Sequence, residues 1–149
     1  MIKLQEGLWQ PADFYHENLH RLKAFGRATN NTKLNKLIDN DNYGVVGLKD
    51  KGRLQINPND KLLTQSIVSY KHYFIFNFYY PPELKNWFCD DWITEIYEKH
   101  DWVFRVEQGF YNLGGAPRYK IYGDRELCDN LLKKYGKHID NYLSFRKIC

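Results

Sequence analysis

The sequence predicts a mixed α/β fold, in which a small mixed sheet is flanked by helices, for a single domain spanning residues 1–149. A short apolar segment between glycines, residues 43–47, is typical of a buried strand. The pattern of Leu127, Leu131, Leu132 and Tyr135 after Asp124 predicts an amphipathic helix. Hydrophobic content of 43% and charged content of 27% are values of a globular domain.

Residues 1–42 are expected to be a lead-in of helix and loop before the core of the domain. A helical pattern begins at Pro11 and is expected to end at Gly26. The polar residues 28–42 predict a loop, and a second polar loop is expected over residues 49–60, after the strand at 43–47.

The core is expected over residues 43–122, with its most apolar part at 62–80. Ile67, Val68 and Tyr70 favour a strand, and the alternating aromatic residues beyond Lys71 predict that this strand continues. Pro81 and Pro82 end it, because proline has no amide hydrogen to donate to a neighbouring strand.

The last part of the core is predicted to hold one helix and two strands. The helix is expected to begin after an N-cap at Asp91 and to end near Lys99. Strands are predicted at 103–106 and 118–122, and C-terminal helices over 123–149. The predicted order is therefore α-β-β-α-β-β-α.

Charge and cysteine content narrow the expected partners and compartment. The net charge of +4 is mild and its basic residues are mixed with acidic ones, so we expect no nucleic-acid partner. No apolar run is long enough for a membrane span, and residues 1–7 lack the apolar segment of a signal peptide. Three widely separated cysteines suggest free thiols in a reducing compartment, so a cytoplasmic location is expected.

Two short motifs in the lead-in could bind metal. His16, Glu17 and His20 spell H-E-x-x-H on a predicted helix, the arrangement of a zinc hydrolase. The alternative is a solvated polar helix face, which Arg21 favours because a buried metal helix is usually apolar there. The Asp-x-Asp motif of residues 39–41 suits a divalent cation, but a polar turn is the preferred interpretation.

Asp90 and Asp91 are the strongest catalytic candidates, because they lie between Trp87 and Trp92. Adjacent carboxylates repel each other, which can raise the pKa of one of them toward a value useful for a general base. Tryptophan rings offer flat faces for stacking on a sugar. The alternative is structural, with Asp91 as N-cap and Asp90 interacting with the helix dipole. A lone histidine such as His72 is more often a hydrogen-bonded core residue than a ligand.

Several segments, taken in order, resemble the C-terminal, acceptor-side half of nucleotide-diphospho-sugar transferases with the GT-A fold. They are residues 43–47, 62–65, His72, 75–76, 81–83, 86–87, 90–93, Tyr97 and 118–119, and more loosely 7–22. The resemblance implies a short helix over 72–76, against the strand predicted there from alternation. It also implies that Asp91 or Asp90 is the general base of a glycosyltransferase, and that Trp92, Trp87, His72 and Arg118 bind a carbohydrate acceptor.

In that family a divalent metal, manganese or magnesium, and a nucleotide sugar bind at an Asp-x-Asp motif that precedes the segment resembling residues 7–9. We therefore expect the donor site to lie outside this chain, in a missing N-terminal half or another chain, with association into a homo-oligomer also possible. Residues 106–108 lack the late histidine that often completes the metal site. The alternative functions are a non-catalytic carbohydrate-binding or interaction module and a zinc hydrolase.

Overall fold

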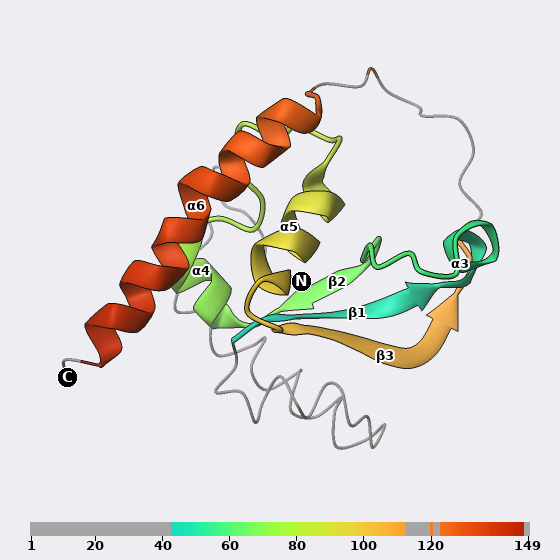
Figure 1. The fold of residues 1–149 in the computed structure, drawn as a ribbon, viewed down its shortest axis with the longest axis horizontal. Coiled ribbons are helices and arrows are strands. Elements are labelled where there is room, and N and C mark those ends of the chain that lie inside the picture. The colour runs from blue at the N-terminus through green and yellow to red at the C-terminus, as the bar shows by residue number, and fades with distance from the viewer. Residues whose placement is uncertain (1–42, 113–119, 121–122, 148–149) are drawn as a thin grey trace, which may run out of the picture.

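The computed structural model describes residues 43–112, 120 and 123–147. Its elements are β1 (Val45–Asp50), α3 (Lys51–Ile56), β2 (Ser66–Val68), α4 (Tyr70–Phe76), α5 (Cys89–Glu98), β3 (Val103–Phe110) and α6 (Arg125–Arg146). Helix α5 packs between the sheet and the long helix α6, and α4 lies beside α6 next to the end of β2 (Figure 1). The predicted mixed α/β fold with a small mixed sheet is confirmed, whereas the GT-A likeness stays a prediction.

The described strands form one sheet in the order β2-β1-β3. Central β1 runs antiparallel to β2, pairing Val45 with Val68, and parallel to β3, pairing Val45 with Val103. Gly44, immediately before β1, has φ +122°, and a Cβ atom there would lie 2.3 Å from the carbonyl oxygen of Trp102. Only glycine fits this position, so the glycine before the predicted strand is needed where the chain enters the sheet.

The strand predicted at 43–47 is confirmed but continues to Asp50, so the predicted polar loop at 49–60 is wrong in its first part. Asp50 caps the short helix α3 by accepting hydrogen bonds from the amides of Gly52 and Arg53, at 3.1 and 3.3 Å. Helix α3 buries none of its residues. It therefore leaves no apolar periodicity in the sequence, and only its capping aspartate could have predicted it.

The long strand expected from Ile67 through the alternating aromatics is also wrong. Strand β2 covers only Ser66–Val68, and the chain then enters α4, whose N-cap Ser69 accepts a hydrogen bond from the amide of Lys71 at 3.1 Å. The buried positions of α4 are 71, 72, 75 and 76, which is helical spacing. This helix confirms the one that the resemblance implied over residues 72–76.

Helix α5 begins differently from the prediction. Its N-cap is Phe88, in the left-handed conformation with φ 65°, and not Asp91. Asp90 and Asp91 instead lie in the first turn, where the helix dipole stabilises negative charge, as expected for Asp90.

The C-terminal elements are simpler than expected. The strand predicted at 103–106 is confirmed and extends to Phe110. The strand predicted at 118–122 falls outside the described residues except for Lys120, which is in no strand. Residues 125–146 form one continuous helix, not several, and it begins where the Asp124 side chain accepts a hydrogen bond from the amide of Leu127 at 2.8 Å. The predicted lead-in over 1–42 lies outside the described residues.

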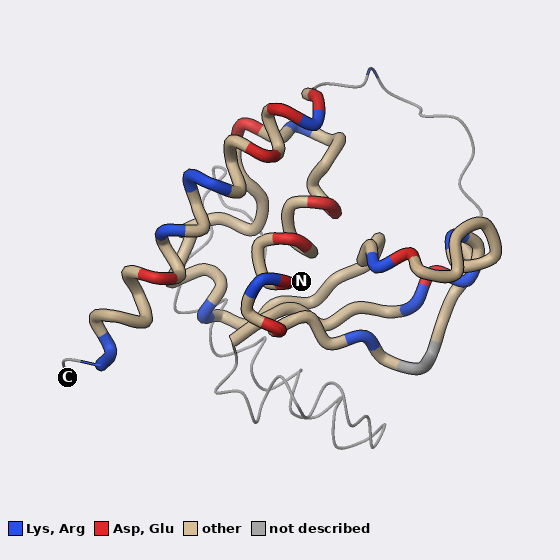
Figure 2. Tube along the Cα trace, viewed as in Figure 1, with Lys and Arg blue, Asp and Glu red and all other residues tan. Residues whose placement is uncertain are grey.

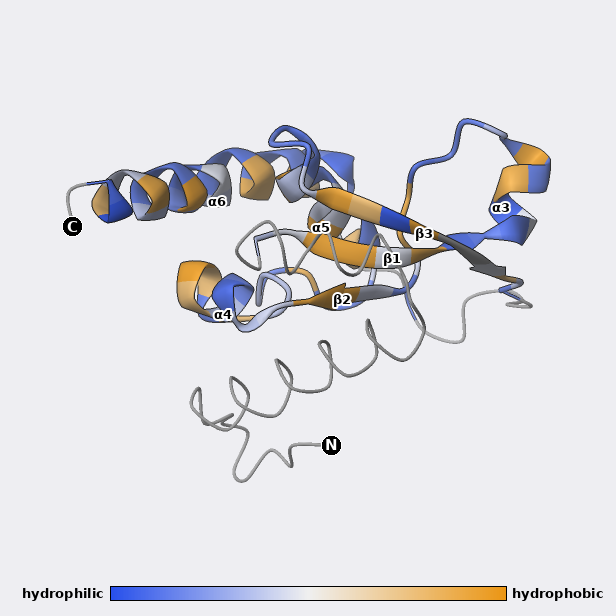
Figure 3. Ribbon diagram, turned by 90° about the horizontal axis from the view of Figure 1, so that it is seen from below, coloured by the Kyte–Doolittle hydropathy of each residue, from blue (hydrophilic) through white to orange (hydrophobic). Residues whose placement is uncertain are grey.

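The core lies where one face of α5 meets the sheet and α6. Trp92, Ile93 and Ile96 of this face are at most 2% exposed. They pack with apolar residues of the neighbouring elements, namely Val45, Val68, Phe76, Leu131, Tyr135 and Ile139. The first part of β1 is accordingly coloured as hydrophobic in Figure 3. Within the described ranges, no helix is both long and apolar enough to cross a membrane.

His72 belongs to this core and joins three elements. Its ring is 2% exposed. The Nε2 atom donates to the carbonyl oxygen of Tyr79 at 2.9 Å, and Nδ1 accepts from the Tyr97 hydroxyl at 2.8 Å. Burial lowers the pKa of His72 from 6.5 to about 4, so the ring is neutral at pH 7. The interpretation of His72 as a hydrogen-bonded core residue is confirmed.

We expect His72 to make stability fall in acid. The unfolded chain binds a proton at this residue below pH 6.5 and the folded chain only near pH 4, so stability is lost as pH falls through this window. Its contribution over the window is on the order of 3 kcal/mol. The difference in the free energy of urea unfolding between the wild type and His72→Gln should therefore be larger at pH 7 than at pH 4.5. An equal difference at both pH values would show that the buried ring does not titrate as described.

Candidate functional site

The first turn of α5 places two carboxyl groups at the edge of the core. Pro81 is buried and its carbonyl accepts a hydrogen bond from the amide of Leu84 at 2.9 Å, which turns the chain before the helix. Phe88 then redirects the backbone, and its carbonyl accepts from the amide of Trp92 at 2.9 Å. Because Trp92 is held in the core, the preceding two residues are fixed at the helix start.

Asp90 interacts electrostatically with two tyrosines, one of which contacts Ser66, and we call Ser66, Tyr79, Tyr80 and Asp90 the Asp90 cluster. The Tyr79 hydroxyl donates to the carbonyl oxygen of Ser66 at 2.9 Å and lies 3.2 Å from its Oγ. The Tyr79 and Tyr80 rings meet edge to face, with centroids 4.7 Å apart. The negative charge of Asp90 acts on both tyrosines. The cluster therefore joins β2, the segment after α4 and the start of α5.

The protonation states of the cluster are those expected if Asp90 acts as a base while the tyrosine hydroxyls keep their protons. Burial, and then the charge of Asp91, raise the pKa of Asp90 from 3.8 to about 6, while Arg53 opposes this shift. Burial also raises the pKa of Tyr79 and Tyr80, so both remain protonated at neutral pH. Among the described residues, Asp90 has no hydrogen-bond or ion-pair partner, and its side chain is partly exposed. Its carboxylate is therefore not held by another group of the described chain.

Asp91 has different surroundings, because it faces helix α6. Its Oδ1 lies 4.0 Å from Nη1 of Arg125. The same guanidinium binds Glu95 at 2.7 and 2.6 Å and Asp129 at 2.8 Å. Burial raises the pKa of Asp91, whereas its own backbone amide and Arg125 are among the groups that lower it. Of the two predicted catalytic residues, Asp90 is thus the unpaired one.

The expected roles of Trp92 and His72 in binding a substrate disagree with their burial. Trp92 is 0% exposed, and its ring lies 5.3 Å from that of Phe76 and 6.2 Å from that of Tyr135. His72 uses both ring nitrogens inside the core. A substrate at the surface reaches neither ring. The sequence placed Trp92 beside Asp91, but consecutive helix residues point about 100° apart, so one is buried and the other is not.

Of the remaining predicted site residues, the structure describes only Trp87. Trp87 is 37% exposed and lies just before α5, where its indole can contact a ligand. Arg118 and the H-E-x-x-H residues His16, Glu17 and His20 lie outside the described residues.

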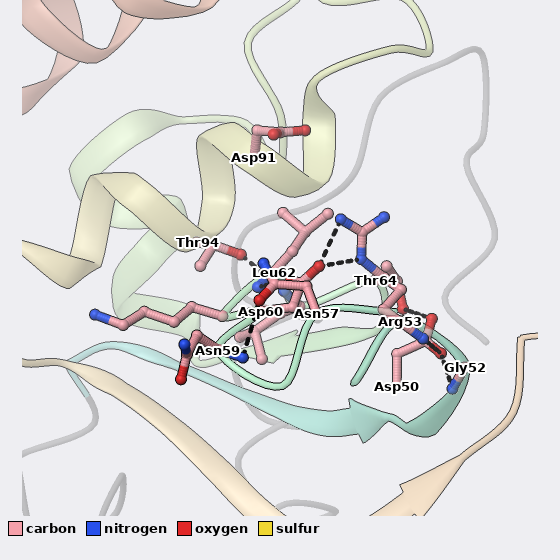
Figure 4. Close-up of polar contacts among 12 residues, drawn as sticks. Asp50, Gly52, Arg53, Asn57, Asn59, Asp60, Leu62, Thr64, Asp91 and Thr94 are labelled. Carbon is pink, nitrogen blue, oxygen red and sulfur yellow. Dashed lines mark hydrogen bonds and ion pairs between the residues drawn. The ribbon is translucent and has the colours of Figure 1, made fainter. Parts of the chain in front are cut away.

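A pocket of about 440 Å³ lies between the end of β1, helix α3, residues 58–63 and β3, and Arg53 is one of its lining residues. Residues 57–60 form a turn at its edge, within the polar loop predicted over 49–60, in which the Asp60 amide donates to the carbonyl of Asn57 at 3.0 Å. The amide of Leu63 donates to Oγ1 of Thr94 at 3.1 Å, which ties this loop to α5 (Figure 4). The sequence did not reveal the pocket, because its walls come from three separate segments.

The carboxylates at this pocket already have partners. Asp50 accepts from the Thr64 hydroxyl at 3.0 Å as well as capping α3, and Asp60 accepts from the amide of Leu62 at 2.8 Å while pairing with Arg53 at 2.8 Å. In the part of the chain that the structure describes, no group of three or more histidine, cysteine, aspartate or glutamate residues could hold a metal ion. The described residues therefore do not fit a divalent metal site.

Comparisons of the chain with protein-family models, with curated proteins and with solved structures gave no match.

Asp90→Asn should stabilise the folded protein at neutral pH. The charged form of Asp90 is disfavoured in the fold, so the wild type gains stability as pH falls through about 6 toward 3.8, and the variant lacks this gain. Because the side chain is partly exposed, screening reduces the effect, and we expect about 1 kcal/mol at pH 7. Urea unfolding at pH 7 and pH 4 measures it. Asp91→Asn is the matched control, with a smaller gain because Asp91 interacts with Arg125. A variant less stable than the wild type at pH 7 would contradict the unpaired state of Asp90.

Proposed function

We propose that this chain is the acceptor-side part of a nucleotide-sugar-dependent glycosyltransferase, with Asp90 as the general base. The observation that carries the proposal is the partly buried carboxylate of Asp90, which has no partner among the described residues and acts electrostatically on Tyr79 and Tyr80. A pKa of about 6 leaves Asp90 ionised at pH 7 while keeping it a stronger base than an ordinary aspartate. The resemblance of the ordered segments to GT-A transferases supports the same assignment.

In the proposed reaction, an acceptor hydroxyl lies against Asp90. The carboxylate takes the hydroxyl proton as the oxygen attacks the anomeric carbon of the donor sugar, and the bond from that carbon to the nucleoside diphosphate breaks. The Tyr79 hydroxyl donates its proton to Ser66, so its oxygen is suited to accepting a hydrogen bond from an acceptor hydroxyl. The exposed face of Trp87 is suited to stacking on a sugar ring.

The donor part of the proposed enzyme needs residues other than those described. A nucleotide sugar with manganese or magnesium is the donor that the resemblance implies, and the described carboxylates do not form such a site. We therefore assign donor binding to residues outside the described ranges, to a separate N-terminal half or to a second copy of the chain.

The second candidate is a carbohydrate-binding module that performs no transfer. The exposed Trp87 and the hydroxyls of the Asp90 cluster favour it, because stacking and hydrogen bonding bind a sugar without a metal. The two candidates differ in nucleotide-sugar binding. A zinc hydrolase at His16, Glu17 and His20 is the third, and it requires stoichiometric zinc in protein prepared without chelator.

The test is calorimetric titration of the full chain with UDP- and GDP-sugars plus manganese and with oligosaccharides, followed by transfer assays in the presence of any donor-binding partner. In an active assembly, Asp90→Asn should lower kcat by about 100-fold or more, the usual effect of losing a general base. Asp91→Asn is the matched control and should retain more activity. Full transfer by Asp90→Asn would overturn the base assignment, and saccharide binding without nucleotide-sugar binding or transfer would favour the binding module.

A further inference from the structure

We propose that the pocket between α3, β1, β3 and residues 58–63 binds the phosphate group of a small phosphorylated molecule, through Arg53 and Arg105. This site is separate from the Asp90 cluster, and the proposal holds whether or not the chain transfers sugars. No sequence motif predicts this pocket, because Arg53 and Arg105 are 52 residues apart in the chain and come to the same pocket only in the folded protein.

Arg105 is held rigidly on one wall of the pocket. From β3, its Nε donates to the carbonyl oxygen of Lys61 at 3.0 Å, and its Nη2 donates to the same oxygen. Burial lowers the pKa of Arg105, although Glu98 and Asp60 oppose this, and the group is still a cation at neutral pH. Among the described residues, Nη1 has no hydrogen-bond partner. A half-buried guanidinium whose Nη1 group lacks a partner can donate a charged hydrogen bond to a bound anion.

Arg53 is oriented in a similar way from α3. Its Nε and Nη2 contact Oδ2 of Asp60 at 2.9 and 2.8 Å, which leaves Nη1 without a partner in the described part of the chain (Figure 4). Asp60 is in turn fixed by the amide of Leu62. Both guanidinium groups are thus positioned before a ligand arrives, which reduces the entropy lost on binding.

The charge of the pocket selects an anion. Its lining has four basic side chains, Lys49, Arg53, Lys61 and Arg105, and two acidic ones, Asp50 and Asp60. Both acidic groups are already engaged, Asp50 by the start of α3 and the Thr64 hydroxyl and Asp60 by the amide of Leu62 and the guanidinium of Arg53. Basic and acidic residues are otherwise interspersed over the described chain (Figure 2). Two guanidinium groups favour the dianionic phosphate over a carboxylate.

The size and apolar lining of the pocket indicate more than an inorganic ion. A volume of about 440 Å³ is that of a small-molecule site, and Leu54, Pro58 and Leu62 add apolar surface beside the arginines. A phosphate attached to a compact organic group, such as a hexose phosphate, fits this combination.

The experiment is calorimetric titration of the full chain at low ionic strength with glucose 6-phosphate, glucose and inorganic phosphate. Glucose 6-phosphate should bind, inorganic phosphate should compete with it, and glucose alone should not bind at this pocket. Arg105→Gln should weaken glucose 6-phosphate binding about tenfold or more, because a charged hydrogen bond is lost. Lys61→Gln, which keeps both arginines and their partners, should weaken it about threefold. Lys133→Gln removes an exposed cation of α6 outside the pocket and should leave affinity unchanged.

Three results would overturn the proposal: no binding of either phosphate at millimolar concentration, equal affinities for glucose and glucose 6-phosphate, or equal losses in Lys61→Gln and Lys133→Gln. Thermal unfolding shows whether Arg105→Gln folds. If it does not, the loss of glucose 6-phosphate affinity in Lys61→Gln relative to Lys133→Gln tests the proposal. Because inorganic phosphate contains no sugar hydroxyl, its binding tests the pocket alone. The result therefore does not depend on the glycosyltransferase assignment.

Discussion

The burial of one face of α5 is the constraint on which the rest of the structure depends. Trp92, Ile93 and Ile96 occupy the space between the sheet and α6, and the neighbouring Tyr97 holds the His72 ring by a 2.8 Å hydrogen bond. Large side chains dominate the energy of such a core, because stabilisation scales with the apolar area removed from water. The position and rotation of α5 therefore determine which of its residues reach the surface.

That rotation separates two roles that are mixed in the sequence. The aromatic residue after the acidic pair serves the core, and the pair itself remains at the edge, where partial burial raises the pKa of Asp90. The raised pKa means that the fold disfavours the charged form of Asp90 relative to the unfolded chain. Groups kept in such a state are more common at functional sites than elsewhere, which is the physical ground for assigning chemistry to Asp90.

Arg53 connects the two sites described. It lowers the pKa of both Asp90 and Asp91 from one side, while its own guanidinium is fixed by Asp60 at the pocket. An anion bound at the pocket would weaken this influence, because it would neutralise part of the positive charge. The two sites are also mechanically joined, since Thr94 of α5 accepts a hydrogen bond from the pocket loop at Leu63.

The sequence by itself determined the mixed α/β class, the strand after Gly44, the strand at 103–106, the start of α6 at Asp124 and the acidic pair as the site to consider. Glycine, capping residues and apolar spacing are local signals, so they can be read without the fold. Only the tertiary structure decided between the strand and the helix expected around residues 70–76, and only it showed that Trp92 is buried, that Asp90 and not Asp91 lacks a partner, and that Arg53 and Arg105 share a pocket. These features depend on contacts between segments distant in the chain, and one strongly aromatic stretch satisfies both helical and strand patterns until packing selects one of them.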